Sequence, residues 1–151
     1  MRVSARSDYA VRALIEVASR PGDPVTAEQV SKAQEIPLKF LLGILGDLRR
    51  AGLVRSQRGP SGGYLMDREP PDITVADIMR AVDGPLASVQ GSRPESMTYP
   101  GAAARLQEVW VALRASLRTV LEAVTLADLV SGDLPPVIAQ LTADAEAWSR
   151  R

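Results

Sequence analysis

The fold is decided by residues 26–66, which read TAEQVSKAQEIPLKFLLGILGDLRRAGLVRSQRGPSGGYLM. A short helix begins at a capping box formed by Thr26 and Gln29, and Pro37 opens a second helix soon after it. This second helix repeats leucine at spacings of three, four and three, which places on one face Leu38, Leu41, Leu45 and Leu48. The pattern predicts a short helix, a tight turn and an amphipathic helix, which is the order of a helix-turn-helix.

A β-hairpin is predicted directly after these helices. Gly52 is expected to end the second helix, and residues 53–57 and 64–66 read as short strands around the turn RGPSGG, residues 58–63. A hairpin in this place is the wing of a winged helix-turn-helix, whose second helix enters the major groove of DNA. We therefore expect a mainly α fold with a small β-hairpin wing, and a DNA-binding domain over residues 1–84.

The rest of the chain predicts flanking helices and a dimerisation helix. Helices are expected over residues 7–19 and from Thr74 to about residue 83, followed by a linker over residues 85–101. A long helix is expected over residues 102–130, and a last short one over 137–149, within a C-terminal unit of residues 102–151. The long helix has a heptad seam that one small domain cannot bury, so we expect it to form a homodimer through Leu106, Trp110, Leu113, Leu117, Val120 and Val124.

Composition restricts the chemistry of the chain. It has no Cys and no His among its 151 residues, so the usual ligands of zinc, haem and iron–sulfur clusters are missing, and so are the usual nucleophile–base pairs. We expect no enzyme, no cofactor and no metal site. No apolar run approaches the length of a membrane span and no signal peptide is evident, so we expect a cytoplasmic protein without membrane contact.

Charge is distributed unevenly although the formal net charge is zero. Residues 1–66 hold 10 Lys and Arg against 6 Asp and Glu, a net charge of +4, and residues 67–151 hold 8 against 12, a net charge of −4. A basic first half favours a nucleic-acid partner for that half.

Candidate DNA-contacting residues lie at the start of the chain, opposite the leucine face, and in the hairpin turn. They are Arg2, Ser4, Arg6, Lys39, Phe40, Gly43, Arg50, Arg58, Gly59, Pro60, Ser61 and Gly62. The first three would bind phosphates, Lys39 and Arg50 phosphates or bases, and Arg58 the minor groove.

Several of these residues have a second explanation. Gly43 and Gly46 each cost a helix about 1 kcal/mol relative to Ala, which either close DNA approach or packing within the protein would explain. Phe40 either packs against the preceding helix or contacts thymine methyl groups. The hairpin glycines are either turn residues or DNA contacts.

Four segments stand in a set order along the chain: DYAVRAL (8–14), AGLVRS (51–56), RGPSGGY (58–64) and DIMRAVDGPL (77–86). Together they closely resemble the Rrf2 family of bacterial regulators, and TLADL (125–129) resembles the end of its dimerisation helix. The resemblance implies a winged helix-turn-helix dimer that binds a roughly palindromic operator as double-stranded DNA, commonly as a repressor.

The sequence departs from this family pattern in two places. Many members hold an iron–sulfur cluster through three cysteines after the fourth helix, in some cases with an acidic ligand at the position of Asp8. Residues 88–100 contain no cysteine here, so we interpret Asp8 as part of helix capping near Ser7. Metal-sensing members often have a Glu-Gln pair where this chain has Leu42-Gly43, so their operator sequence does not carry over.

An alternative function is a regulatory interaction protein, in which the acidic C-terminal half binds a partner protein and DNA binding is secondary. A small-molecule effector or a partner protein would supply the signal in either case. Arg93, Glu95, Met97 and Tyr99 either line an effector pocket or belong to a surface loop. Trp110 and Trp148 belong either to the dimer core or to a ligand site.

Overall fold

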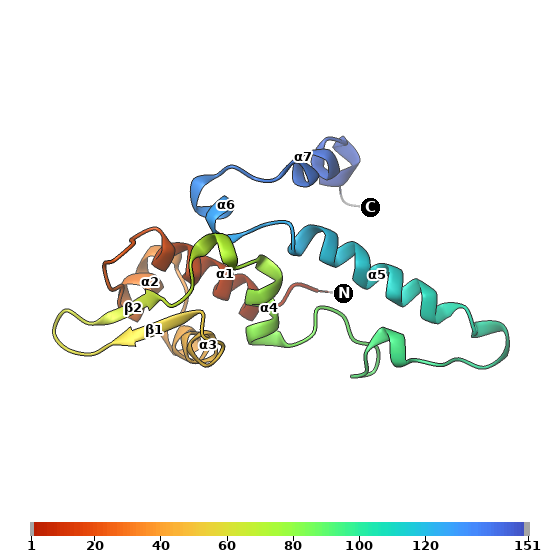
Figure 1. The fold of residues 1–151 in the computed structure, drawn as a ribbon, viewed down its shortest axis with the longest axis horizontal. Helices are drawn as coiled ribbons and strands as arrows, with labels where there is room; N and C mark the ends of the chain where they lie inside the picture. Colours follow the sequence, from red (N-terminus) through yellow and green to blue (C-terminus); the bar gives the residue numbers. More distant parts are fainter. Residues whose placement is uncertain (1, 150–151) are drawn as a thin grey trace.

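The structure is a computed structural model that describes residues 2–149 (Figure 1). Its N-terminal part comprises α1 (Ala5–Ala18), α2 (Ala27–Gln34), α3 (Leu38–Arg50), β1 (Val54–Gln57), β2 (Gly63–Met66) and α4 (Val75–Asp83). The remainder comprises α5 (Leu106–Leu121), α6 (Leu126–Ser131) and α7 (Pro136–Thr142), with short 3₁₀ turns at Pro70–Asp72, Pro94–Ser96, Gly101–Ala103 and Ala145–Trp148. The predicted fold, mainly helical with a small antiparallel hairpin, is confirmed.

The capping boxes begin the helices where the sequence predicts. Thr26 accepts a hydrogen bond from the Gln29 amide at 3.1 Å, and the Gln29 side chain accepts one from the Thr26 amide at 2.9 Å. Thr74 and Asp77 form the same reciprocal pair at the start of α4. Each box satisfies two amides that a helix start leaves unpaired, so these starts are fixed by residues three apart.

One hydrophobic core holds the N-terminal part together. The leucine face of α3 is confirmed, because Leu41, Leu45 and Leu48 are fully buried, and Leu38 packs at its margin. The core is completed by α1, α2, α4 and the segments between them, and its largest side chains include Leu14, Val17, Val25, Val30, Ile36, Ile44, Ile73 and Ile78. Burial of these side chains fixes which face of α3 remains outside.

Arg12 connects α1 to the end of α2. Its guanidinium donates to the backbone carbonyl of Gln34, the last residue of α2, and pairs with Asp8 one turn earlier at 3.1 Å. The N-cap of α1 is Ser4, whose hydroxyl accepts from the Ser7 amide at 2.9 Å. The predicted capping role of Asp8 is therefore wrong, since Asp8 lies in the first turn and holds Arg12.

The long predicted helix is interrupted. Helix α5 ends at Leu121, and Thr125 starts α6 through a capping box with Asp128. The Val124 carbonyl accepts from the Val75 amide at 2.9 Å, and the Leu126 amide donates to the Ile73 carbonyl at 2.8 Å, which draws the chain back onto the N-terminal core. A continuous helix could not make both backbone hydrogen bonds, so the heptad pattern overestimates its length.

Helix α5 extends away from the N-terminal bundle (Figure 1). The chain runs out from α4 through a loop and returns along α5 to α6. None of the 16 residues of α5 is fully buried, although the helix carries the predicted apolar seam. Within residues 2–149, no helix has both the length and the apolar character needed to cross a membrane.

Candidate nucleic-acid interface

The turn between α2 and α3 is fixed by local hydrogen bonds. Glu35 ends α2 in the left-handed region, with φ of 52°, and Ile36 behind it is buried. The Ser31 carbonyl accepts a hydrogen bond from the Ile36 amide at 3.0 Å, and the Ser31 hydroxyl donates one to the Ile36 carbonyl at 2.6 Å. This turn sets the angle at which α3 leaves α2, so α3 presents a single face outward.

The outward face of α3 carries the predicted cation and apolar side chains. Lys39 and Arg50 are exposed, and 65% of Phe40 is accessible to solvent. Phe40 lines a small surface pocket with Ala5, Arg6 and Tyr9 of α1 and Ile44 of its own helix. No residue of α2 lines this pocket.

Gly43 lies open on this face. A Cβ atom built there would meet no atom within 4 Å, and one built at Gly46 would meet only the Arg50 guanidinium at 3.6 Å. Packing inside the protomer therefore does not require a glycine at position 43. A surface that comes close to α3 from outside does explain it, because a helix can approach another molecule most closely where it has no side chain.

The hairpin places Arg58 at an exposed tip. Its strands pair from Val54 with Met66 to Gln57 with Gly63, and residues 58–61 are all exposed. A Cβ atom at Gly62 would lie 2.3 Å from the Gln57 carbonyl oxygen, so this tight turn requires glycine. The turn explanation for Gly62 is thus sufficient, and its absent side chain is what allows the tip around Arg58 to form.

The hairpin is fixed to the segment before α2. Val25 and Tyr64 exchange two backbone hydrogen bonds, at 3.0 Å and 2.8 Å. At Gly63 a Cβ atom would lie 2.7 Å from the Val25 backbone, and the φ of 152° disfavours other residues. The wing therefore has a defined position relative to the helix-turn-helix.

The predicted phosphate-binding residues near the N-terminus have partners inside the protomer. Arg6 donates to the Val82 carbonyl at 3.1 Å and forms an ion pair with Asp47 of α3. Ser4 donates to the Asp83 carboxylate, which also accepts from the buried Ser7 hydroxyl at 2.6 Å. Arg2 is exposed. Phosphate contacts by Ser4 and Arg6 stay predictions, and they would have to compete with these partners.

Three further exposed residues belong to the same region and were not among the DNA contacts predicted from the sequence. Leu42 is 49% exposed on α3, Arg49 lies in the last turn of that helix, and Arg55 lies on β1. Arg49 donates to the Ser56 hydroxyl at 3.4 Å, which connects α3 to the wing. No alternation along β1 could have identified Arg55, because Val54 is buried and the three residues after it are all exposed.

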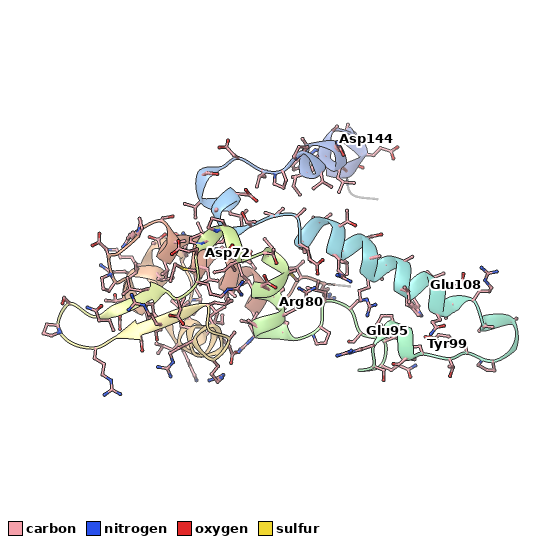
Figure 2. All side chains as sticks on the ribbon, in the orientation of Figure 1. Asp72, Arg80, Glu95, Tyr99, Glu108 and Asp144 are labelled. Carbon is pink, nitrogen blue, oxygen red and sulfur yellow. The ribbon has the colours of Figure 1, made fainter. Side chains whose placement is uncertain are left out.

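The predicted dimerisation residues divide into two groups. Five of them lie along α5, where Leu113 is 40% exposed and Leu106, Trp110, Leu117 and Val120 are half-buried. The Trp110 indole donates to the Tyr99 hydroxyl at 3.1 Å, and Tyr99 lies in the loop beside α5 (Figure 2). Val124 is only 6% exposed within the protomer, so the structure does not present it to a partner.

Known proteins resemble this chain along most of its length. Residues 3–132 match the family model Rrf2, described as an iron-dependent transcriptional regulator. The HTH-type transcriptional regulator Rv1287 of Mycobacterium tuberculosis is 47% identical over 148 residues, which cover 97% of this chain and 92% of that protein.

Two solved structures share the fold. CymR, the global cysteine regulator of B. subtilis, has a TM-score of 0.74 and 32% identity over 87% of this chain and 98% of its own. IscR of T. potens has a TM-score of 0.70 and 30% identity over 100% of this chain and 93% of its own.

The residues of this chain do not fit an iron–sulfur centre. Such clusters are held by thiolates, with imidazole as the usual substitute, and the sequence contains neither. The segment after α4 instead contributes Arg93 to a pocket lined by three more arginines, and a guanidinium group offers no acceptor atom to iron. In the part of the chain that the structure describes, no three carboxylates come together either.

Proposed function

The chain belongs to the Rrf2 family of transcriptional regulators, and we propose that it represses transcription by binding a palindromic operator as a homodimer. The observation that carries this proposal is the outward face of α3. The opposite face of α3 is buried in the core, while Lys39, Phe40 and Gly43 lie outside it. Packing within the protomer does not require a glycine at position 43. Such a helix fits the major groove as a recognition helix.

The wing and the N-terminus would bind the DNA outside the bases that α3 reads. Arg58 extends from a turn that glycine makes tight, and the electrostatic potential of a narrow minor groove attracts arginine. Arg2 and Arg50 are exposed cations suited to phosphates. The contacts from the start of α3 would read bases, and those from Arg50, the wing and the N-terminus would fix the register.

A homodimer is supported by the unburied apolar residues of α5. A free helix with this many apolar positions is unfavourable in water, and packing the same helix of a second copy against it removes that surface. Two copies related by a two-fold axis would present two α3 helices, and such a pair matches a palindromic site with half-sites about one helical turn apart. A dimer on a promoter can repress simply by excluding the polymerase.

The test is selection of bound duplexes from a random library with the full chain, followed by footprinting of the enriched sequence. We expect an inverted repeat that both protomers protect. A reporter gene downstream of this repeat should be less active when the protein is present. Enrichment of no sequence would favour the alternative function as a partner-protein binder. A reporter that becomes more active would leave DNA binding in place and overturn repression.

A further inference from the structure

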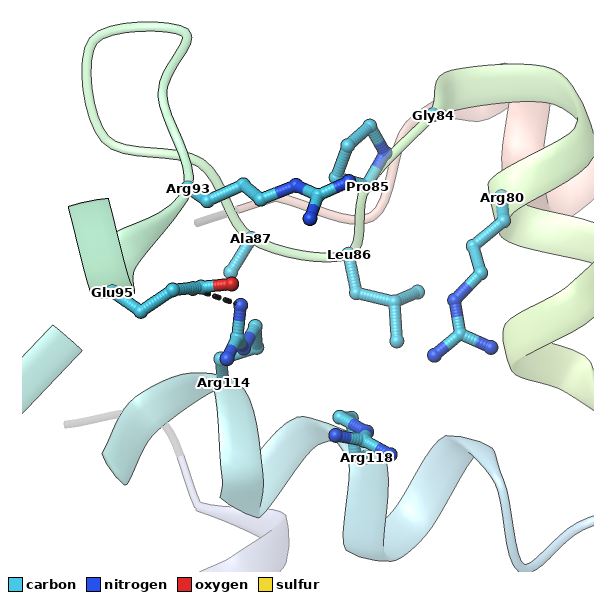
Figure 3. Close-up of a pocket in the computed structure, with 9 residues that line it drawn as sticks. All are labelled: Arg80, Gly84, Pro85, Leu86, Ala87, Arg93, Glu95, Arg114 and Arg118. Carbon is cyan, nitrogen blue, oxygen red and sulfur yellow. Dashed lines mark hydrogen bonds and ion pairs between the residues drawn. The ribbon is translucent and has the colours of Figure 1, made fainter. Parts of the chain in front are cut away.

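Four arginine side chains surround one surface pocket between α4, the loop after it and α5 (Figure 3). Arg80 belongs to α4, Arg93 to the loop, and Arg114 and Arg118 to successive turns of α5. The volume of the pocket is about 510 Å³. Residues from separate parts of the sequence thus direct four guanidinium groups toward one space.

Carboxylates only partly balance these charges. Glu122 accepts from both Arg80 and Arg118 on a single oxygen, Oε1, with Arg118 Nε at 3.0 Å. Arg80 also lies 3.5 Å from Asp77, whose carboxylate already caps α4. One carboxylate oxygen shared between two cations leaves several guanidinium N–H groups without an acceptor at the pocket.

Only one of the other two arginines has a carboxylate partner. Glu95 forms an ion pair with Arg114, drawn as a dashed line in Figure 3. The Arg93 guanidinium has no hydrogen bond or ion pair among residues 2–149, and Arg93 is exposed. A backbone hydrogen bond and the Arg114 guanidinium hold the pKa of Glu95 below its ordinary value, so Glu95 is ionised at neutral pH and occupies Arg114.

We propose that this pocket binds a small oxyanion with two negative charges, either a phosphate ester or a dicarboxylate, as the effector of the protein. The planar guanidinium fork matches both groups in two-point hydrogen bonds. Leu86, Pro85 and Ala87 form an apolar wall beside the arginines, which suits the carbon part of such a ligand. The effector role rests on the proposed function, whereas the binding site does not.

A ligand in this pocket would connect the DNA-binding domain to the dimer. Arg80 lies on α4, which packs against α1 and α3. Arg114 and Arg118 each follow a seam residue by one position, so they lie roughly 100° around α5 from the seam. Binding would therefore fix α5 relative to α3 without covering the seam, and would favour one spacing of the two α3 helices to the extent that the affinities of the two states differ.

The binding test is titration calorimetry of the full chain, without DNA, using inorganic phosphate and succinate as separate probes. We expect saturable binding of at least one probe, and the probe that binds identifies the ligand class. Arg93→Gln should weaken it roughly tenfold, because a charge-assisted hydrogen bond is lost and no fold contact is removed. Arg105→Gln is the matched control, since it makes the same charge change on an exposed residue outside the pocket.

A second variant should change the affinity for the probe in the opposite direction. Glu95→Gln frees Arg114 from its carboxylate partner, so affinity for the probe should rise about threefold or more. A purely structural role for Glu95 would leave affinity unchanged or lower it. Failure of both probes to bind at millimolar concentration would overturn the site, and so would equal weakening by Arg93→Gln and Arg105→Gln.

The effector role is tested separately with the selected operator at constant ionic strength. Operator affinity of the wild type should change severalfold when the probe saturates the pocket, and Arg93→Gln should need about tenfold more probe for the same change. An operator affinity that the bound probe leaves unchanged would overturn the effector role. Loss of the proposed function would give a different result, namely intact calorimetry with no operator binding at all.

Discussion

Arg6 of α1 forms an ion pair with Asp47 of α3, and the same carboxylate also pairs with Arg50. Asp47 is largely covered, with 16% of its side chain exposed. One acidic side chain on the proposed recognition helix therefore holds two of the cations that the sequence assigns to DNA. DNA phosphates would compete with Asp47 for both.

We expect Asp47→Asn to increase affinity for an unrelated duplex severalfold, because it removes a negative charge and releases Arg6 and Arg50. If a phosphate contact is gained, the slope of log affinity against log salt concentration should steepen by about 1. Binding measured at several salt concentrations checks this. Asp133→Asn, on an exposed loop residue, is the charge-matched control, and identical slopes for both variants would contradict the competition.

Arg58→Ala should weaken operator binding by roughly tenfold or more, and Lys39→Ala by less. Arg58 lies at the tip of the wing and Lys39 on α3, both exposed, so neither change should lower the free energy of unfolding. Titration of operator DNA by fluorescence anisotropy measures both, with Arg105→Ala, at the residue before α5, as the control. Wild-type affinity in both variants would show that DNA does not lie against these elements.

Gly43→Ala separates stability from DNA binding. The new Cβ atom meets nothing within 4 Å in the protomer, and Ala is favoured over Gly in a helix, so the free energy of unfolding should rise by about 0.5–1 kcal/mol. Operator affinity should fall if DNA approaches this face closely.

Gly62→Ala is the contrasting variant, because its Cβ atom would collide with the Gln57 carbonyl. It should lower the free energy of unfolding by about 1–3 kcal/mol. Urea unfolding and operator titration of both variants give the comparison. A Gly43→Ala protein that binds operator as tightly as wild type would remove the main support for α3 as the recognition helix.

Leu113→Asp combined with Leu117→Asp should convert the dimer to monomers, because it places charges where a second α5 would pack, at a cost of several kcal/mol. Leu113 is 40% exposed and Leu117 half-buried in the protomer, so the fold should survive and circular dichroism should change little. Sedimentation velocity measures the oligomeric state. The control is Ala115→Asp, which introduces a charge on the opposite side of α5 and should leave the dimer intact. A wild-type protein that is monomeric at micromolar concentration would contradict dimerisation through the apolar seam.

DNA binding should be independent of iron, nitric oxide and thiol oxidation. The chain offers no thiolate or imidazole, and carboxylates alone suit hard cations such as Mg²⁺ rather than iron–sulfur clusters. Anaerobic purification, a visible spectrum, metal analysis and operator affinity with chelator, nitric oxide donor or peroxide check this. A coloured protein with stoichiometric iron, or a tenfold change in affinity, would contradict it.

The sequence by itself determined the elements whose contacts are local. Thr26 with Gln29 and Thr74 with Asp77 start helices through hydrogen bonds that span three residues, and Gly62 makes a turn whose closest contact lies five residues away. These interactions form in any context that lets the local chain fold. The winged helix-turn-helix and the outward face of α3 could therefore be predicted before any tertiary contact was known.

Tertiary structure alone decided the features that depend on residues distant in the chain. The backbone hydrogen bond from the Val75 amide to the Val124 carbonyl goes with the early end of α5. Thr125 and Asp128 carried a local capping signal for α6, but the heptad pattern predicted a continuous helix through them. Arg6 meets Asp47 only because α1 packs on α3. The arginine pocket likewise forms only because packing brings Arg80 of α4 close to Arg118 of α5. Charges act through space, so their partners follow from packing, which no local pattern specifies.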